Sequence, residues 1–267
     1  MTTMVFRNGN WEESTSLEAT HEVLTGQGLF ETIFVKNQVP QFLDLHLARL
    51  RNSSEILGIP SPDFDKVIVG VEELLLLQEG KLGRLRITLF GGVPTPQLML
   101  SLVEVSTPLA KVSVNISPWT RNEDSAIAGA KSTSYAENVV ALNRAKESGF
   151  TETLFFNNAG QLAEAATSNI VIVVDEEAVT PPLSSGCLPG ITRQVLLELG
   201  VMREVSIDSG SLERASAAAL LSSIRGVQPI NVLGERELNS RDETVQHLSK
   251  VYEARVAQDK ENWAKLP

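Results

Sequence analysis

The sequence has a single cysteine, Cys187, among its 267 residues. One thiol excludes a disulfide within the chain, and a reducing cytosol is the simplest compartment for such a protein. The N-terminus, MTTMVFRNGNWEESTSLEAT, has no apolar core of the kind that a secretory signal needs. No apolar run reaches the length of a membrane span, since Glu72 and Glu73 interrupt VIVGVEELLLL. We therefore expect a cytoplasmic protein with no membrane partner.

Positive charge is also scarce, because 23 Lys and Arg residues face 33 Asp and Glu residues and the net charge is −10. An acidic balance argues against nucleic acid as the main partner, although it allows a small anion to bind in a local basic pocket. The apolar content of 42% and charged content of 21% are ordinary for a soluble globular protein. The length is sufficient for one large domain or two modest ones with real cores.

Several signatures of known chemistry are missing. His21, His46 and His247 are scattered without the spacing of metal ligands, so the sequence predicts no metal site. It contains no G-x-S-x-G nucleophile motif, no P-loop, and no G-x-G-x-x-G that opens a helix after a strand. The candidate chemistry must therefore come from other residues.

Hydrophobic periodicity predicts a small α+β unit in the first third of the chain. Its expected elements are two strands within 28–42, helices over 44–59 and 62–80, and strands over 84–90 and 97–105. We place a small N-terminal domain at residues 1–112 and a larger C-terminal α/β domain at 113–267.

The strand at this boundary has Val112, Val114 and Ile116 on one face. Further on, Ser134 and Glu137 have the spacing of a capping box, which predicts a helix start. The remaining expected elements are a meander of strands over 152–180 and helices that begin at 191 and cover 209–221 and 242–263.

The start of the predicted helix at Ile191 is a candidate anion site. Pro189 and Gly190 form a turn with little side-chain bulk before it, and Thr192 adds a hydroxyl in its first turn. The first N–H groups of a helix lack intrahelical partners and carry positive partial charge, so they bind phosphate well. A phosphate also favours a guanidinium, and Arg49 in HLARL is a candidate. Spacing alone favours an ordinary helix entry and a solvated arginine.

A lysine and a glutamate complete the candidate set. Lys131 lies in IAGAKSTSYAEN, between small residues and a helix start. Burial near positive backbone charge would favour the neutral, nucleophilic amine, and the alternative is an ordinary surface lysine. Glu164 lies among alanines and apolar residues in QLAEAATSNI, where a carboxylate needs a partner or a function. The alternative is a solvent-facing glutamate on an edge strand.

Together these segments resemble the fold type IV pyridoxal-phosphate enzymes, which include branched-chain aminotransferases, D-amino acid aminotransferases and aminodeoxychorismate lyases. The resemblance covers nearly the whole chain, in order, through GQGLFET, HLARL, AKSTSYAENVVA, NNAGQLAEAATSNI, TPPLSSGCLPGITR and LLSSIRGVQPI. It implies a two-domain fold with pyridoxal 5'-phosphate between a small N-terminal and a larger C-terminal α/β domain. It also implies a homodimer in which residues of one subunit close the other's site.

The resemblance further implies roles for individual residues. Lys131 would hold the cofactor aldehyde as a Schiff base and then move a proton at the substrate's α carbon. Glu164 would face the pyridine nitrogen and keep it protonated, which makes the ring an electron sink. The phosphate would be held by Arg49, the backbone N–H groups of Ile191 and Thr192, the Thr192 hydroxyl and Ser223.

Within the family, GLFET is more similar to the lyases than to the branched-chain enzymes, and RLRITLFGGVPTPQ lacks the Arg-x-His of the D-amino acid enzymes. We therefore expect an aminodeoxychorismate lyase, which forms 4-aminobenzoate and pyruvate in folate synthesis. The alternative is a branched-chain-like amino-acid aminotransferase, and a remote alternative is a non-catalytic cofactor-binding relative.

The candidate contacts with a small amino substrate are Phe30, Thr32, Arg86 and Tyr135. Arg86 would hold a carboxylate, with a purely structural pairing as the alternative. Tyr135 would point toward Lys131 by helical spacing, with a packing role as the alternative.

Overall fold

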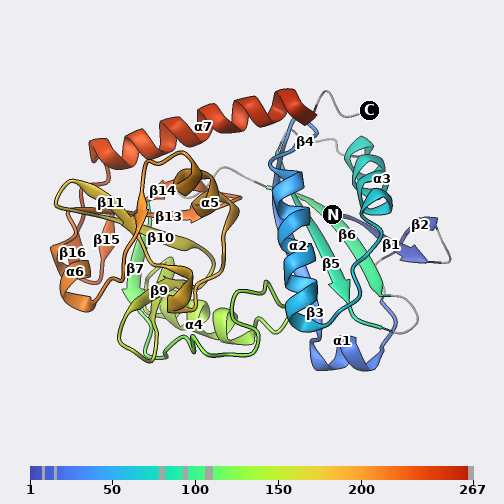
Figure 1. Cartoon of the computed structure of the whole chain (residues 1–267), viewed down its shortest axis with the longest axis horizontal. Helices are drawn as coiled ribbons and strands as arrows, with labels where there is room; N and C mark the ends of the chain where they lie inside the picture. The colour runs from blue at the N-terminus through green and yellow to red at the C-terminus, as the bar shows by residue number, and fades with distance from the viewer. Residues whose placement is uncertain (8–9, 15–16, 78–81, 93–95, 106–110, 264–267) are drawn as a thin grey trace. The chain divides into compact units, whose positions relative to one another are not determined.

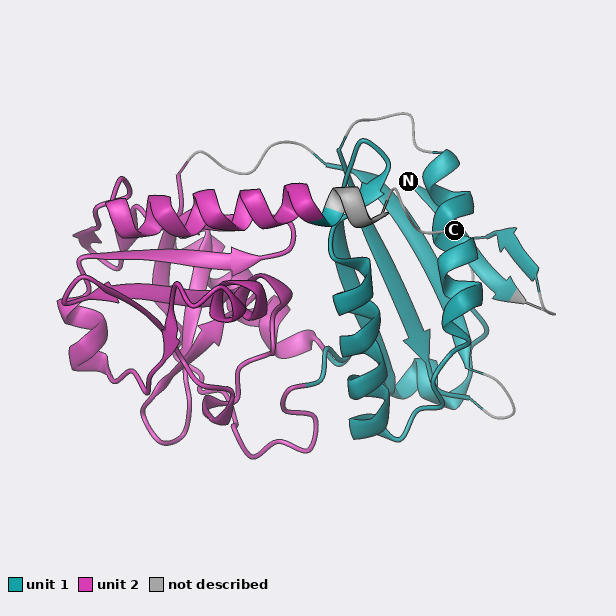
Figure 2. Cartoon of the chain, turned by 45° about the horizontal axis from the view of Figure 1, so that its top comes forward, with its two compact units in different colours: residues 1–107, 130–134, 259–267 teal, residues 108–129, 135–258 magenta. Residues whose placement is uncertain are grey.

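The computed structural model describes the chain apart from residues 8–9, 15–16, 78–81, 93–95, 106–110 and 264–267. The chain divides into two compact units, which Figure 2 distinguishes by colour. Unit 1 comprises residues 1–107, 130–134 and 259–267, and unit 2 comprises 108–129 and 135–258. The segment that carries Lys131 is thus part of unit 1, although the residues on both sides of it in the sequence belong to unit 2.

Unit 1 is built on a six-stranded antiparallel sheet in the order β2-β1-β6-β5-β3-β4 (Figure 1). Its strands are β1 (Thr2–Arg7), β2 (Asn10–Glu13), β3 (Gly28–Lys36), β4 (Val39–Pro40), β5 (Leu82–Phe90) and β6 (Gln97–Glu104). Its helices are α1 (His21–Thr25), α2 (Leu43–Leu57) and α3 (Phe64–Leu76). The strands and helices predicted for this region are confirmed, and the predicted end of the second helix at Gly80 lies outside the described residues.

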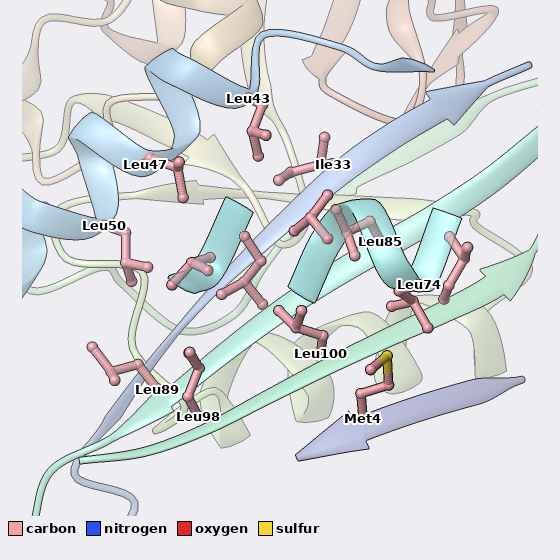
Figure 3. Packing of buried hydrophobic residues seen from close by; sticks show 14 of the residues in the cluster. Met4, Ile33, Leu43, Leu47, Leu50, Leu74, Leu85, Leu89, Leu98 and Leu100 are labelled. Atoms are coloured by element: carbon pink, nitrogen blue, oxygen red, sulfur yellow. The ribbon is translucent and has the colours of Figure 1, made fainter. Parts of the chain in front are cut away.

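The core of unit 1 is a single apolar cluster that α2, α3 and one face of the sheet share. Successive side chains of a strand point to opposite faces, so Leu29, Ile33 and Val35 of β3 enter this cluster together. Figure 3 shows side chains of both helices and the sheet meeting there, among them Leu43, Leu47, Leu50, Leu74, Leu85 and Leu100. Each such buried side chain contributes about 1.5–3 kcal/mol of hydrophobic stabilisation.

Unit 2 contains two five-stranded sheets, in the orders β12-β11-β10-β13-β14 and β16-β15-β7-β8-β9. The strands are β7 (Ser113–Ile116), β8 (Glu152–Phe156), β9 (Leu162–Ala165), β10 (Asn169–Val174), β11 (Glu177–Thr180), β12 (Arg203–Glu204), β13 (Ala217–Ser222), β14 (Gly226–Pro229), β15 (Val232–Leu233) and β16 (Arg236–Glu237). The helices that begin in this unit are α4 (Ala136–Glu147), the short 3-10 turn Leu183–Ser185, α5 (Ile191–Glu198), α6 (Ser209–Arg214) and α7 (Glu243–Trp263). Both sheets contribute to one core, since Val114 and Leu154 of one sheet and Ile172 and Leu220 of the other belong to the same cluster.

Two expectations for unit 2 are wrong. The helix predicted over 209–221 ends at Arg214, and the alanine run that follows forms β13 between β10 and β14. Alanine favours helices intrinsically, but here burial in a central strand position overrides that preference. Ser134 does not cap α4, because its hydroxyl donates to the carbonyl of Gly26.

Within the described part of the chain, none of the helices combines the length and the apolar character that a bilayer span requires.

A buried ionic cluster fastens α2 to β3. Arg49 donates to both carboxylate oxygens of Glu31, from Nε at 2.9 Å and from Nη2 at 2.5 Å. His46, which is three residues before Arg49 on the same helix face, places Nδ1 2.6 Å from Glu31. Burial opposes ionisation of Glu31, but the Arg49 charge and the hydrogen bonds from Arg49 and His46 outweigh it and lower the pKa to about 2. Burial lowers the pKa of His46, with the bond to Glu31 in partial opposition.

Replacing Glu31 should reveal this stabilisation as a pH dependence. The pKa falls from an ordinary value of 4.5 to about 2 in the folded state, which corresponds to on the order of 3 kcal/mol. Because the folded-state pKa is lowered, the contribution is fully present above about pH 4.5 and is lost as the pH falls toward 2. Urea unfolding should therefore show Glu31→Gln to be less stable than the wild type at neutral pH, by a margin that narrows below about pH 4.5.

The matched control is Glu55→Gln on the exposed side of α2, which should change the free energy of unfolding by less than about 0.5 kcal/mol. A margin between Glu31→Gln and wild type that stays constant from neutral pH into acid would contradict the assignment.

Candidate functional site

The predicted site residues fall in both units. In unit 1, Lys131 lies in a short segment that pairs with the start of β3. The backbone N–H of Phe30 donates to the Lys131 carbonyl at 2.8 Å, and that of Thr133 donates to the Gly28 carbonyl at 2.8 Å. This pairing holds the backbone of the segment, and the Lys131 side chain places Nζ 4.3 Å from the centroid of the Phe30 ring.

Three predicted substrate residues of unit 1 lie on β3 and β5, and one of them, Phe30, is in contact with this amine. Phe30 and Thr32 alternate with Glu31 on β3 and therefore share the other face of the strand. Arg86 of β5 stands opposite Thr32 in the register, and its guanidinium carbon lies 3.8 Å from the Phe30 centroid. The structure thus brings Phe30, Thr32, Arg86 and Lys131 together on one side of the sheet. Two cations on one aromatic ring form a local basic site suited to an anionic group.

Arg49 is not the solvated helix-face arginine that spacing alone favours, because its side chain is only 8% exposed. Its bidentate pairing with Glu31 sets the orientation of the guanidinium. Glu31 and His46 were missed as functional candidates. The sequence does contain a signal for Glu31, because a glutamate within the apolar strand GLFETIFV requires a partner.

In unit 2, Glu164 is held from two directions. It lies on the edge strand β9 with its side chain 12% exposed, so the solvent-facing alternative is wrong. Its Oε2 accepts from the backbone N–H of Leu188 at 3.0 Å, and its Oε1 lies 3.4 Å from Nη2 of Arg121. Arg121 stacks on the ring of Phe155, with its guanidinium carbon 4.4 Å from the centroid. Sequence reasoning missed Arg121 because nothing local distinguishes it from other loop arginines.

The start of α5 is built without a capping side chain. Gly190 is the N-cap residue and has no side chain to accept from the first turn. A Cβ at this position would lie 1.9 Å from Oδ1 of Asn169, whose Nδ2 donates to the carbonyl of Leu188 at 2.8 Å. Glycine is therefore needed for the close approach of Asn169, which holds the loop before the helix. The backbone N–H groups of Ile191 and Thr192 belong to this uncapped first turn.

Tyr252 of α7 lies beside two parts of the predicted phosphate site. The Thr192 hydroxyl donates to the Tyr252 hydroxyl at 3.2 Å. A Cβ at Gly226 would lie 3.3 Å from the Tyr252 ring, and Gly226 directly follows the turn at 223–225 that contains Ser223. Tyr252 was also missed, because a tyrosine in an amphipathic helix has no local feature that separates it from a core residue.

Tyr135 immediately precedes α4 and does not share a helix with Lys131, so the helical-spacing argument is wrong. Its hydroxyl donates to the carbonyl of Ala166 at 2.8 Å. Burial, followed by the charges of Glu164 and Glu152, raises its pKa above the ordinary value, so the phenol stays protonated at neutral pH.

Two other kinds of reactive centre receive no support. Burial, followed by the Glu164 charge, raises the pKa of the Cys187 thiol to about 11, so this thiol is not an activated nucleophile. In the part of the chain that the structure describes, no group of three or more His, Cys, Asp and Glu residues is arranged to hold a metal ion.

Comparison with known proteins adds an independent line of evidence. The bifunctional aminodeoxychorismate lyase / D-amino acid transaminase of Mycobacterium tuberculosis is 27% identical over 220 residues, which cover 71% of this chain and 74% of that protein. The aminodeoxychorismate lyase of Bacillus subtilis is 25% identical over 262 residues, which cover 89% of both. The structure of a fold IV transaminase from Curtobacterium pusillum superposes with a TM-score of 0.80 at 26% identity, covering 96% of this chain and 98% of that one.

The predicted type IV α/β fold is confirmed by this structural match. The family model described as "Amino-transferase class IV" matches residues 28–233, which is well over half of the sequence. The match contains both the Lys131 segment and the start of α5. The chain therefore belongs to the amino-transferase class IV family.

Proposed function

We propose that this protein is an aminodeoxychorismate lyase, which removes pyruvate from aminodeoxychorismate and leaves 4-aminobenzoate. As a class IV family member it is a pyridoxal-phosphate-dependent enzyme of the lyase or transferase type. The observation that carries the lyase proposal is the grouping of Thr32 and Arg86 with Lys131 around Phe30. A guanidinium and an amine on the same aromatic ring, with a hydroxyl opposite the arginine in the strand register, suit a substrate that carries carboxylates. Two relatives that bear the lyase name support the same choice.

The residues present fit pyridoxal phosphate. Lys131 offers an amine for the cofactor's aldehyde, and Glu164 offers a carboxylate for the pyridine nitrogen. Arg49 offers a guanidinium, and the uncapped first turn of α5 offers the N–H groups of Ile191 and Thr192 for the phosphate. The aldehyde, the pyridine nitrogen and the phosphate of the cofactor are three different chemical groups, and each has a suitable partner in this chain.

The reaction then depends on a small number of side chains. Bound pyridoxal phosphate supplies an electron sink for bond breaking at the carbon that carries the substrate amine. Lys131 would hold the aldehyde of the cofactor through Nζ and, once the substrate is bound, would remove a proton from the carbon that carries the substrate amine. Glu164 would keep a proton on the pyridine nitrogen. Arg86 and Thr32 orient a carboxylate of the substrate.

A second candidate is an amino-acid aminotransferase with branched-chain-like specificity. Its support is a relative from Salmonella typhimurium that is named a branched-chain-amino-acid aminotransferase, together with Arg86, which suits the carboxylate of an amino acid equally well. The two reactions share the removal of a proton by Lys131. They differ in the step that follows. The lyase releases pyruvate from the substrate, whereas the aminotransferase passes the amino group on to a 2-oxo acid. A few contacts in the pocket control which of these steps occurs.

We also propose that the protein acts as a homodimer in the cytoplasm. Unit 2 exposes large apolar side chains near β7 and on α4, namely Ile116, Trp119, Val139 and Val140, each about half exposed. Such a group suits burial against a second subunit. The single buried Cys187 suits a reducing compartment.

Two assays on the purified enzyme test the reaction. One contains aminodeoxychorismate, and the other contains an amino acid with a 2-oxo acid. The lyase proposal expects pyruvate and 4-aminobenzoate in the first assay and little amino exchange in the second. Amino exchange in the second assay without product in the first would replace the lyase with the aminotransferase.

Lys131→Ala should abolish the covalent link to the cofactor. Borohydride should fix pyridoxal phosphate to the wild-type chain but not to the variant, and mass spectrometry of the peptides locates the adduct. Turnover should fall by about 10³-fold or more, the scale of a lost acid–base group. Lys146→Ala, at an exposed position of α4, is the control and should retain both properties. Full turnover by Lys131→Ala would refute the catalytic assignment.

Glu164→Gln keeps the shape of the side chain but removes the charge that faces the pyridine nitrogen. We expect kcat to fall by about 10²–10³-fold, as when a preorganised electrostatic partner is lost. Cofactor binding should weaken much less, since the phosphate contacts are intact. Glu147→Gln, 68% exposed, is the control and should behave as wild type. An unchanged kcat in Glu164→Gln would show that the carboxylate does not act on the cofactor.

A further inference from the structure

The C-terminal helix α7 lies outside the part of the chain that the family model describes. The family match ends at residue 233, and α7 begins at Glu243. Nevertheless α7 supplies Tyr252, which is only 4% exposed and contacts the first turn of α5. A buried tyrosine hydroxyl requires a hydrogen-bond partner, and one partner here is the Thr192 hydroxyl, which the proposed function places at the phosphate.

Tyr252 also contacts the second element of the predicted phosphate site. Its ring lies against Gly226, where an added Cβ would be 3.3 Å from Cε1. Gly226 has a φ of +62°, a backbone conformation that glycine adopts without strain, and it closes the turn that contains Ser223. Arg225, next to it in this turn, donates to the buried Glu152 at 3.1 Å. Both the Arg225 bond to Glu152 and the Tyr252 ring against Gly226 thus support the turn.

We propose that Tyr252 is a positioning residue for the cofactor phosphate, with its hydroxyl orienting Thr192 and its ring supporting the turn at 223–226. The inference rests on the proposed function, because it takes Thr192 and Ser223 as phosphate ligands. A hydroxyl has one donor and two acceptor sites and can rotate. When Thr192 turns its proton to a phosphate oxygen, Tyr252 donates to Thr192 in return. This reversal keeps both buried hydroxyls paired and strengthens Thr192 as a donor.

The test compares two ligands that differ only in the phosphate. Full-length apoprotein is titrated with pyridoxal 5'-phosphate and, separately, with pyridoxal, and the change in protein fluorescence gives each dissociation constant. Tyr252→Phe keeps the ring and removes the hydroxyl. It should weaken binding of pyridoxal 5'-phosphate by about fivefold to tenfold, the scale of one buried hydrogen bond, and leave binding of pyridoxal unchanged.

A double-mutant cycle locates the effect at Thr192. Thr192→Val should also weaken binding of pyridoxal 5'-phosphate selectively, and the variant with both changes should be little worse than Thr192→Val alone. Tyr252→Ala, which also removes the ring, should lose more affinity for pyridoxal 5'-phosphate than Tyr252→Phe does. Glu253→Gln, at the exposed neighbouring position of α7, is the control and should bind both ligands as wild type does.

Each result decides the inference. Wild-type affinity of Tyr252→Phe for pyridoxal 5'-phosphate overturns it, and so does an equal loss for both ligands with a lowered Tm, which would make Tyr252 a packing residue only. If the wild-type apoprotein binds neither ligand, the proposed function fails and the inference fails with it. Selective loss in Tyr252→Phe supports the inference whichever reaction the enzyme catalyses.

Discussion

The buried ion pair between Glu31 and Arg49 holds α2 against β3, the strand that carries Phe30 and Thr32 of the candidate site. A carboxylate in a strand interior is costly unless a well-oriented partner accompanies it, and the forked guanidinium supplies two parallel bonds. The consequence is geometric. With Glu31 directed to the helix side, the alternation of the strand directs Phe30 and Thr32 to the other side, where Lys131 and Arg86 lie over the aromatic ring.

In unit 2, too, specific partners hold the polar side chains of the candidate site. Glu164 is held by Arg121 and by the backbone of Leu188, and Asn169 holds the carbonyl of Leu188. The loop before α5 is therefore fastened from two neighbouring strands, β9 and β10. This leaves no space for a side chain at position 190, so the helix begins on a glycine and its first N–H groups have no side-chain cap. Both the packing of the loop and the binding of an anion favour glycine at position 190.

The errors in prediction also arise from contacts between segments that are distant in the sequence. The residues Ala217–Leu221 have the composition of a helix, yet they occupy a strand between two others, because pairing with β10 and β14 buries all of them. Ser134 and Glu137 have capping-box spacing, yet Ser134 bonds to Gly26, more than a hundred residues earlier. Local propensity was outweighed in both cases by contacts between distant segments, which no window of the sequence contains.

The sequence by itself determined the family, the order of most strands and helices, and the chemical types of the candidate residues, because motifs and periodicity are properties of neighbouring positions. Only the tertiary structure decided which partners those residues have. Arg121 beside Glu164, Tyr252 beside Thr192, and Glu31 beside Arg49 each join segments that are separate along the chain. Hydrogen bonds and ion pairs act over a few ångströms in space, whatever the separation in sequence, so the orientation of each site residue became visible only once the chain was folded.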